Sequence, residues 1–229
     1  VSTGPTPYDM MRALVSTVLL ASLSFFAQAQ DTKSAGAGSA AAGEKKAQMC
    51  IGCHGIVGYQ ATFPEVHKVP MISGQGAKYI AAALNAYKKG ERRHPTMRGI
   101  AVSLSDQDIA DLSAFYEQHG KSAPVPEQAP PAQADVAKLF EKGACASCHG
   151  ANFSKPIDGS YPKIAGQHAD YLFVALKSYK VEGNQTVGRG NAIMAGQVKQ
   201  FSNAELRAMA QYLATLPGEV RIVKQSYFR

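Results

Sequence analysis

Apolar residues recur three and four positions apart in several stretches of the chain, which is the spacing that places them on one face of an α-helix. This pattern runs through residues 77–88 and 169–180 and begins again after Ser105 and after Ser202. Each of these serines is followed three residues later by a carboxylate, as in the capping box that opens many helices. No stretch alternates apolar and polar residues as a half-buried strand does. The pattern therefore predicts an all-α fold.

The helical pattern occurs twice because the chain contains an internal repeat. Two blocks, two tyrosines and a methionine return in the same order: Cys50–Gly55 at Cys145–Gly150, Pro70–Gln75 at Pro162–Gln167, Tyr79 and Tyr87 at Tyr171 and Tyr179, and Met97 at Met194. Such a repeat predicts two tandem domains of similar fold. We place the first domain at residues 44–120 and the second at residues 133–218.

The first 29 residues have the organisation of a secretory signal peptide. Arg12 precedes an apolar run over residues 13–27, and the run ends in Ala27-Gln28-Ala29, a small-residue cleavage site. We expect cleavage after Ala29 and export to the periplasm, with an uncleaved membrane anchor as the alternative. No later run is long enough to span a bilayer.

Three further segments lie outside the expected domains. Residues 30–43 are rich in Ala, Gly and Ser, which predicts a flexible lead-in. Residues 121–132 contain four prolines, which favour an extended linker. Residues 219–229 have no counterpart in the first repeat, and this tail is either a frayed terminus or a segment that docks on a partner.

Each repeat contains the Cys-x-x-Cys-His signature of c-type haem attachment, in which two thiols add to the porphyrin vinyl groups and the histidine ligates the iron. The residues assigned to these roles are Cys50, Cys53 and His54 in the first repeat and Cys145, Cys148 and His149 in the second. A disulfide within each pair would leave the histidines unexplained. A thioredoxin-like pair needs a strand–helix–strand setting, and a shared zinc site would have to join pairs about 90 residues apart.

A methionine is the expected sixth iron ligand in each domain. Among the methionines and the remaining histidines, Met97 and Met194 are the pair that recurs, whereas Met49, Met71 and Met209 face other residue types in the second copy or the first. We expect both in loops ahead of the last capped helix, outside the helices in which methionine is usually core filler. Histidine ligation, or an open site in one domain, remains the alternative.

Together, the two Cys-x-x-Cys-His motifs, the Pro-x-x-x-Gly-Gln blocks, the late methionines and the capped last helix resemble the di-haem cytochrome c4 family. The resemblance covers roughly residues 44–217. It implies two class I cytochrome c folds packed about a pseudo-twofold axis, two covalently bound haem c groups that face one another, and a periplasmic electron carrier that feeds a terminal oxidase. Neither Cys-His-Gly is followed by the Asp-Gly turn that the family often shows, so the loops at the haem edges are expected to differ.

The chain has a formal net charge of +7, spread over both repeats and the tail. A modest basic excess suits acidic redox partners, namely a terminal oxidase, a quinol:cytochrome c reductase or a dehydrogenase, and does not indicate nucleic-acid binding. The basic run over residues 88–93 is the expected docking segment, with a merely solvated loop as the alternative. Peripheral association with a membrane stays open.

Two other functions compete with that of a free carrier. One is the cytochrome subunit of a periplasmic dehydrogenase, such as a sulfide-oxidising flavocytochrome. The other is a di-haem enzyme with one open iron site. Ligation by both Met97 and Met194 argues against the enzyme, and no catalytic residue stands out in the sequence.

Overall fold

The computed structural model describes residues 36–120 and 124–223. The expected signal peptide with its cleavage site lies outside these residues, as does the end of the tail. Within the described chain, no helix combines the length and the apolar character needed to cross a membrane. Most of the ordered elements are helices, and the expected all-α class with two tandem domains is confirmed.

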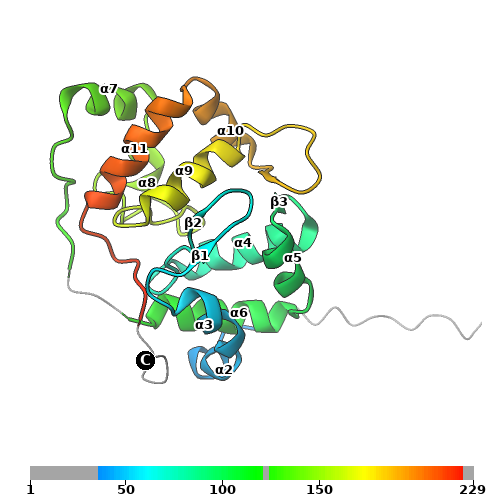
Figure 1. The fold of residues 1–229 in the computed structure, drawn as a ribbon. Helices are drawn as coiled ribbons and strands as arrows, with labels where there is room; N and C mark the ends of the chain where they lie inside the picture. The colour runs from blue at the N-terminus through cyan, green and yellow to red at the C-terminus, as the bar shows by residue number, and fades with distance from the viewer. Residues whose placement is uncertain (1–35, 121–123, 224–229) are drawn as a thin grey trace, which may run out of the picture. The chain divides into compact units, whose positions relative to one another are not determined.

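The helices of the first repeat lie together (Figure 1). Their buried side chains contribute to a hydrophobic core. These helices are α2 (Ala40–Lys46), α3 (Gln48–His54), α4 (Ala77–Lys89), α5 (Pro95–Val102) and α6 (Asp106–Gln118). Helix α6 contacts both α2 and α4, and its Leu112 is 1% exposed. The buried face of α6 therefore joins the amino-terminal helix to the helix that follows the Pro-x-x-x-Gly-Gln block.

The second repeat is built in the same way (Figure 1). Its helices are α7 (Ala134–Lys142), α8 (Ala146–His149), α9 (Ala169–Ser178), α10 (Ala192–Lys199) and α11 (Asn203–Thr215). Helix α11 packs against α9 and α7, and Leu206 in its first turn is fully buried. The segments that the sequence predicted as helices, residues 77–88 and 169–180, correspond to α4 and α9 to within a few residues.

Short antiparallel ladders complete the fold. Strands β1 (Gln60–Ala61) and β2 (His67–Lys68) pair within the first repeat. Strands β3 (Arg92–Arg93) and β4 (Gly188–Arg189) pair across the two repeats. The sequence did not predict these strands, because two residues are too few to show an alternating pattern.

Both predicted capping boxes are present. The Ser105 hydroxyl accepts the backbone N–H of Asp108, and the Asp108 carboxylate accepts the backbone N–H of Ser105. Ser202 and Glu205 make the same exchange at the start of α11. Because each box satisfies two backbone donors at a helix start, the last helix of each repeat begins at a fixed residue.

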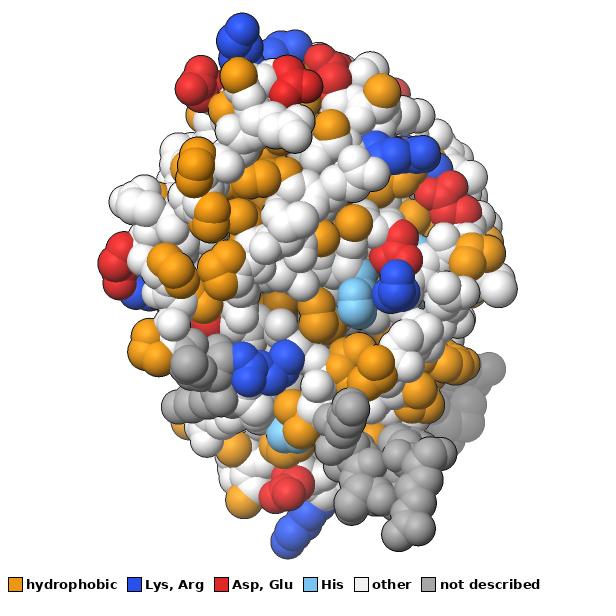
Figure 2. All heavy atoms as spheres, turned by 60° about the vertical axis from the view of Figure 1, so that its left-hand side comes forward, with side chains coloured by type: hydrophobic (Ala, Val, Ile, Leu, Met, Phe, Trp, Pro, Cys, Tyr) orange, Lys and Arg blue, Asp and Glu red, His pale blue; other side chains and the backbone are white. Residues whose placement is uncertain are grey.

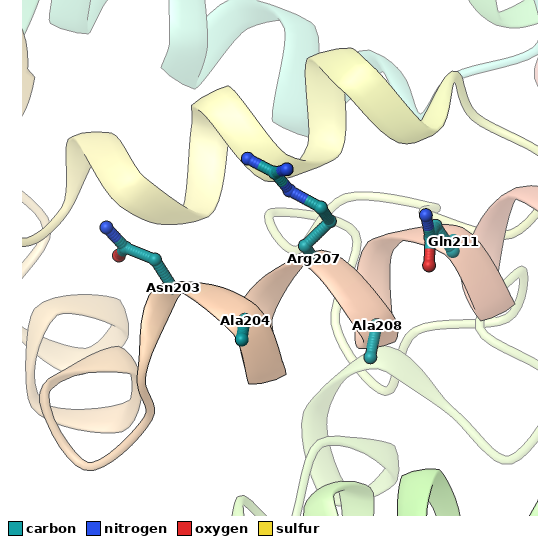
Figure 3. A pocket seen from close by; sticks show the side chains of 5 residues that line it. All are labelled: Asn203, Ala204, Arg207, Ala208 and Gln211. Atoms are coloured by element: carbon teal, nitrogen blue, oxygen red, sulfur yellow. The ribbon is translucent and has the colours of Figure 1, made fainter.

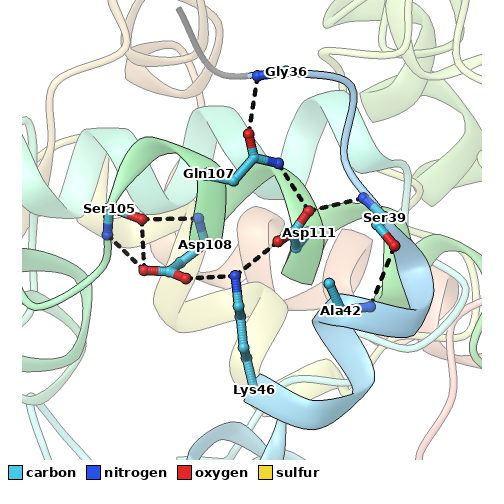
Figure 4. A network of polar contacts seen from close by, with 8 residues as sticks. All are labelled: Gly36, Ser39, Ala42, Lys46, Ser105, Gln107, Asp108 and Asp111. Carbon is cyan, nitrogen blue, oxygen red and sulfur yellow. Dashed lines mark hydrogen bonds and ion pairs between the residues drawn. The ribbon is translucent and has the colours of Figure 1, made fainter. Parts of the chain in front are cut away.

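The expected flexible lead-in over residues 30–43 is wrong for its last part, because α2 begins at Ala40. The Ser39 hydroxyl caps this helix, and the Ser39 N–H donates to Asp111 of α6 (Figure 4). Lys46 pairs with Asp108 at 2.6 Å and with Asp111 at 2.7 Å. Gly43 lies so close to α6 that a Cβ there would collide with the Asp111 carbonyl oxygen. The small residues that suggested flexibility instead allow close packing of two helices.

The Pro-rich linker and the start of the tail also have defined contacts. Asn152 donates to the Pro126 carbonyl at 2.7 Å, so the linker lies on the second repeat. At the tail, the Arg221 N–H donates to the Ser73 carbonyl at 3.0 Å, and Val220 is 5% exposed. Residues 219–223 are therefore a strap that links the second repeat to the first rather than a frayed end. The remainder of the tail lies outside the described residues.

The Lys46 cluster predicts a measurable acid sensitivity. Hydrogen bonds from Lys46 lower the pKa of Asp108 and of Asp111 to about 2. A carboxyl whose folded-state pKa is lowered stabilises the fold above its unfolded-state pKa of about 4 and loses that contribution as the pH falls toward 2. We expect Lys46→Met to lower the melting temperature at pH 6 and to flatten its decline between pH 4 and pH 2.

A suitable control is Lys199→Met, which breaks an ion pair between two exposed side chains, Lys199 and Glu182. This variant should follow the wild-type melting profile at every pH. Melting curves of Lys46→Met that run parallel to those of the wild type from pH 6 to pH 2 would contradict the assignment.

Candidate functional site

The two Cys-x-x-Cys-His motifs lie on short helices. In the first repeat the motif forms the end of α3, and in the second it runs from the residue before α8 to the end of that helix. Residues three apart on a helix share one face, so the two thiols of each motif point to the same side. All four cysteines, Cys50, Cys53, Cys145 and Cys148, are free and half-buried. This arrangement can present two thiols to one edge of a planar ring.

Each motif histidine is held by a carbonyl of the Pro-x-x-x-Gly-Gln block. The Nδ1 atom of His54 lies 2.8 Å from the Pro70 oxygen, and Nδ1 of His149 lies 3.0 Å from the Pro162 oxygen. A carbonyl oxygen only accepts, so Nδ1 carries the proton and Nε2 keeps a free lone pair. Burial lowers the pKa of both histidines, which favours the neutral form. A neutral imidazole with a free Nε2 is the form that ligates a metal.

The two candidate methionines lie in helices, which corrects the expectation that they lie in loops. Met97 belongs to α5 and Met194 to α10, and the backbone N–H of each donates to the capping side chain three residues earlier, His94 or Asn191. Both methionines are half-buried, and Met194 packs against the core of the second repeat. The sequence pattern missed these helices because they have eight residues each and lack the Ser–carboxylate box.

A cluster of arginines and tyrosines lies where the two repeats meet. The β3–β4 ladder places Arg92 opposite Arg189. Arg92 donates to the hydroxyl of Tyr79 at 3.2 Å and of Tyr171 at 2.8 Å, and Arg189 donates to Tyr171 at 3.1 Å. The guanidinium of Arg92 also stacks 4.6 Å above the ring of Tyr87. These three tyrosines were recognised as repeated, but the arginines, which recur five residues before each methionine, were not.

This cluster corrects the docking interpretation of residues 88–93. Arg92 lies inside the contact between the repeats, and Lys88 is used within the first repeat, where it donates to the Leu104 carbonyl at 2.7 Å. Only Lys89 and Glu91 of the run have exposed side chains. Several side chains of the basic run are therefore half-buried and engaged in contacts within the protein. Figure 2 shows lysine and arginine scattered among other side chains on the face it draws.

The arginine cluster has an uncompensated positive charge. Among residues 36–120 and 124–223, neither Arg92 nor Arg189 forms an ion pair, and the buried Nε of Arg92 has no hydrogen-bond partner. Burial alone would raise the pKa of Tyr171, but Arg189 and Arg92 outweigh it and lower that pKa to about 7. A buried pair of guanidiniums with a spare donor fits a bound group that carries carboxylates, such as the propionates of haem.

Other parts of the described chain have fewer features of a functional site. Its His, Cys, Asp and Glu side chains form no group of three or more that could hold a bare metal ion. A hollow of about 340 Å³ lies on the surface of α11 and is lined by Asn203, Ala204, Arg207, Ala208 and Gln211 (Figure 3). The Arg207 guanidinium is engaged with the Phe173 ring at 4.4 Å. This hollow brings together no titratable groups that could perform chemistry.

The cap of α10 gives a prediction that does not depend on any bound group. Replacing Asn191 by Ala removes the acceptor for the Met194 N–H, which lies 2.9 Å away. Loss of an N-cap side chain costs about 1 kcal/mol, so the free energy of unfolding should fall by about that amount in denaturant titrations. Asn191→Ser, which restores an acceptor, should recover most of it, and equal losses in both variants would show that the cap is not the cause.

Comparisons with known proteins agree with this geometry. The family model for cytochrome c matches the chain twice, over residues 40–119 and 133–217. Cytochrome c4 of Pseudomonas aeruginosa is 31% identical over 214 residues, which cover 90% of this chain and 100% of that protein. A thiosulfate dehydrogenase electron acceptor of Stutzerimonas stutzeri is 28% identical over 182 residues, which cover 74% of this chain and 80% of that protein. The crystal structure of reduced recombinant cytochrome c4 from Pseudomonas stutzeri matches with a TM-score of 0.61 at 30% identity, covering 79% of this chain and 100% of that one.

Proposed function

Because the chain belongs to the di-haem cytochrome c4 family, whose two tandem domains bind covalently attached haem c, we propose that it carries single electrons through the periplasm to a terminal oxidase. The proposed donor is a quinol-oxidising complex or a dehydrogenase. Export would follow from cleavage after Ala29, where the sequence has the features of a signal peptidase site.

We assign the attachment and ligand roles by repeat. The proposed thioether bonds are made by Cys50 and Cys53 in the first repeat and by Cys145 and Cys148 in the second. The proposed axial ligands are His54 with Met97 and His149 with Met194. Arg92 and Arg189 supply positive charge for the propionates.

The observation that carries this proposal is that the two histidines have the same hydrogen-bonding state. Both donate Nδ1–H to the proline carbonyl of their own repeat, at 2.8 Å and 3.0 Å, and both therefore keep Nε2 free. Two sites prepared in the same way suit two equal groups in one chain. A disulfide or a redox-active thiol pair would need no such preparation of a histidine.

The ligand set favours a carrier over an enzyme. Bound haem supplies an iron that gains and loses one electron. With a histidine and a methionine as ligands in each repeat, the iron would have no coordination position left for a substrate. A neutral thioether in a half-buried setting also disfavours the extra charge of ferric iron, which suits transfer to an oxidase.

One comparison favours a second candidate for the electron donor. A relative over 74% of this chain is described as a thiosulfate dehydrogenase electron acceptor. A periplasmic dehydrogenase is therefore an alternative to the quinol-oxidising complex as the source of electrons. Reduction of the purified protein by either class of donor, compared at equal concentrations, distinguishes them.

The first test is the near-infrared absorption of the oxidised protein, which contains a weak band for methionine bound to ferric haem. We expect the intensity due to two haems in the wild type and half of it in Met97→Ala and in Met194→Ala. Mass spectrometry should find two haems attached in all three proteins. A wild-type band with the intensity due to one haem, or no band, would overturn the assignment and would favour an enzyme whose iron has an open coordination position.

A second test concerns the arginine pair. Removing a buried positive charge near the haems stabilises ferric iron, so Arg189→Met should lower the reduction potentials measured by spectroelectrochemistry. Lys138→Met, which removes an exposed positive charge on α7, should leave them nearly unchanged because solvent screens it. Potentials that fall equally in both variants would show that the arginine pair has no special role.

A further inference from the structure

We propose that Gln75 and Gln167 are positioning residues that each act on the iron-ligating histidine of the other repeat. The inference rests on the proposed function, in which His54 and His149 ligate the two irons. It goes beyond that function because it makes the contact between the repeats a determinant of each haem's reduction potential.

The first chain of hydrogen bonds between the repeats runs from Gln167 to His54. The carbonyl of Pro70 and the N–H of Met71 belong to one planar peptide group. The carbonyl accepts from His54 Nδ1 at 2.8 Å, while the N–H donates to Gln167 Oε1 at 3.0 Å. One peptide group of the first repeat therefore separates its histidine from a side chain of the second.

The second chain of hydrogen bonds runs in the opposite direction, from Gln75 to His149. The carbonyl of Pro162 accepts from His149 Nδ1 at 3.0 Å, and the N–H of the same peptide group, from Lys163, donates to Gln75 Oε1 at 2.9 Å. Neither glutamine contacts the histidine peptide of its own repeat in these bonds. Each repeat thus completes the hydrogen bonding behind the other repeat's histidine.

The glutamines are held as part of the interior. Each is 4% exposed, and each Nε2 donates back across the interface, from Gln75 to the Lys163 carbonyl at 2.9 Å and from Gln167 to the Met71 carbonyl at 2.8 Å. The preceding glycines have positive φ, 83° at Gly74 and 73° at Gly166, which turns the chain where a side chain would be strained. The Gly-Gln pair of the repeated block is therefore explained by a contact that crosses between repeats.

Polarisation of the peptide group between glutamine and histidine determines whether the reduction potential rises or falls when the glutamine amide is removed. A peptide group whose N–H is hydrogen-bonded becomes a stronger acceptor at its carbonyl, so the histidine Nδ1–H bond strengthens. A stronger bond at Nδ1 makes the imidazole a more basic ligand and favours ferric iron. Removing the glutamine amide should therefore raise the reduction potential of the haem in the opposite repeat.

The test is a crossed comparison of Gln75→Leu and Gln167→Leu in the full-length holoprotein. The two one-electron potentials are measured by spectroelectrochemistry and assigned to their domains from the NMR signals of the axial ligands. We expect Gln167→Leu to raise the potential of the first haem and Gln75→Leu that of the second, with a smaller change at the other haem in each case. Glu65→Gln is the control, because it removes an ion pair of 2.7 Å between the repeats, to Lys177, without contacting either histidine peptide.

Three results would overturn the inference: a larger shift in the haem of the mutated repeat, equal shifts in both haems, or shifts no larger than those of Glu65→Gln. If the leucine variants do not fold, Gln→Asn variants, which keep an amide but are one methylene shorter, serve the same comparison. Failure of the proposed function is seen separately, since it would appear in the wild type as absent haem or absent methionine ligation.

Discussion

The interaction on which much of this structure depends is the hydrogen bond that holds Nδ1 of each motif histidine on a fixed backbone acceptor, as iron ligation through Nε2 would require. In each repeat the acceptor is a proline carbonyl, at position 70 or 162. Proline restricts its own backbone and has no N–H, which makes it a rigid choice at this place. The same peptide group is then fixed at its N–H by a glutamine from the other repeat. The orientation of each motif histidine and the association of the repeats therefore depend on the same peptide group.

In the contact between the repeats, corresponding residues of the two copies make equivalent bonds. Gln75 bonds the backbone of Lys163, and Gln167 bonds the backbone of Met71 at the corresponding place. The β3–β4 ladder likewise sets Arg92 against its own counterpart, Arg189. Such reciprocal pairing is the signature of a twofold relation, here within one chain. A single sequence block therefore supplies both halves of the interface.

Features that depend on neighbouring residues could be predicted, and features that depend on distant ones could not. The capping boxes at Ser105 and Ser202 are local chemistry, so the starts of the last helices were correct. The helix that begins at Ala40 was missed because its close packing depends on Asp111, far along the chain. Arg92 was placed in a docking segment because nothing near it in the sequence reveals its contact with Tyr171.

The candidate site was predictable to the same extent. The repeat singled out the four cysteines, the two histidines and the two methionines, because each recurs in the same order in both copies, and their roles stay predictions. It could not show that Met97 and Met194 lie in helices, since the caps there are His94 and Asn191 rather than a serine with its carboxylate. The cationic pair escaped notice for a related reason: Arg92 and Arg189 meet through the β3–β4 ladder, although they lie far apart in the sequence.

The two sites share their backbone contacts but differ in the side chains around them. At corresponding positions the first repeat has Met71 and the second has Lys163, whose Nζ donates to the Gly74 carbonyl at 2.9 Å and pairs with Glu219 at 2.5 Å. Glu219 begins the strap over residues 219–223, which has no counterpart after the first repeat. Because the hydrogen bonds behind the two histidines are alike, a difference in potential between the two haems has to arise from such unequal charges and contacts. The repeated block thus sets the common geometry, and the residues that break the repeat make the two sites distinct.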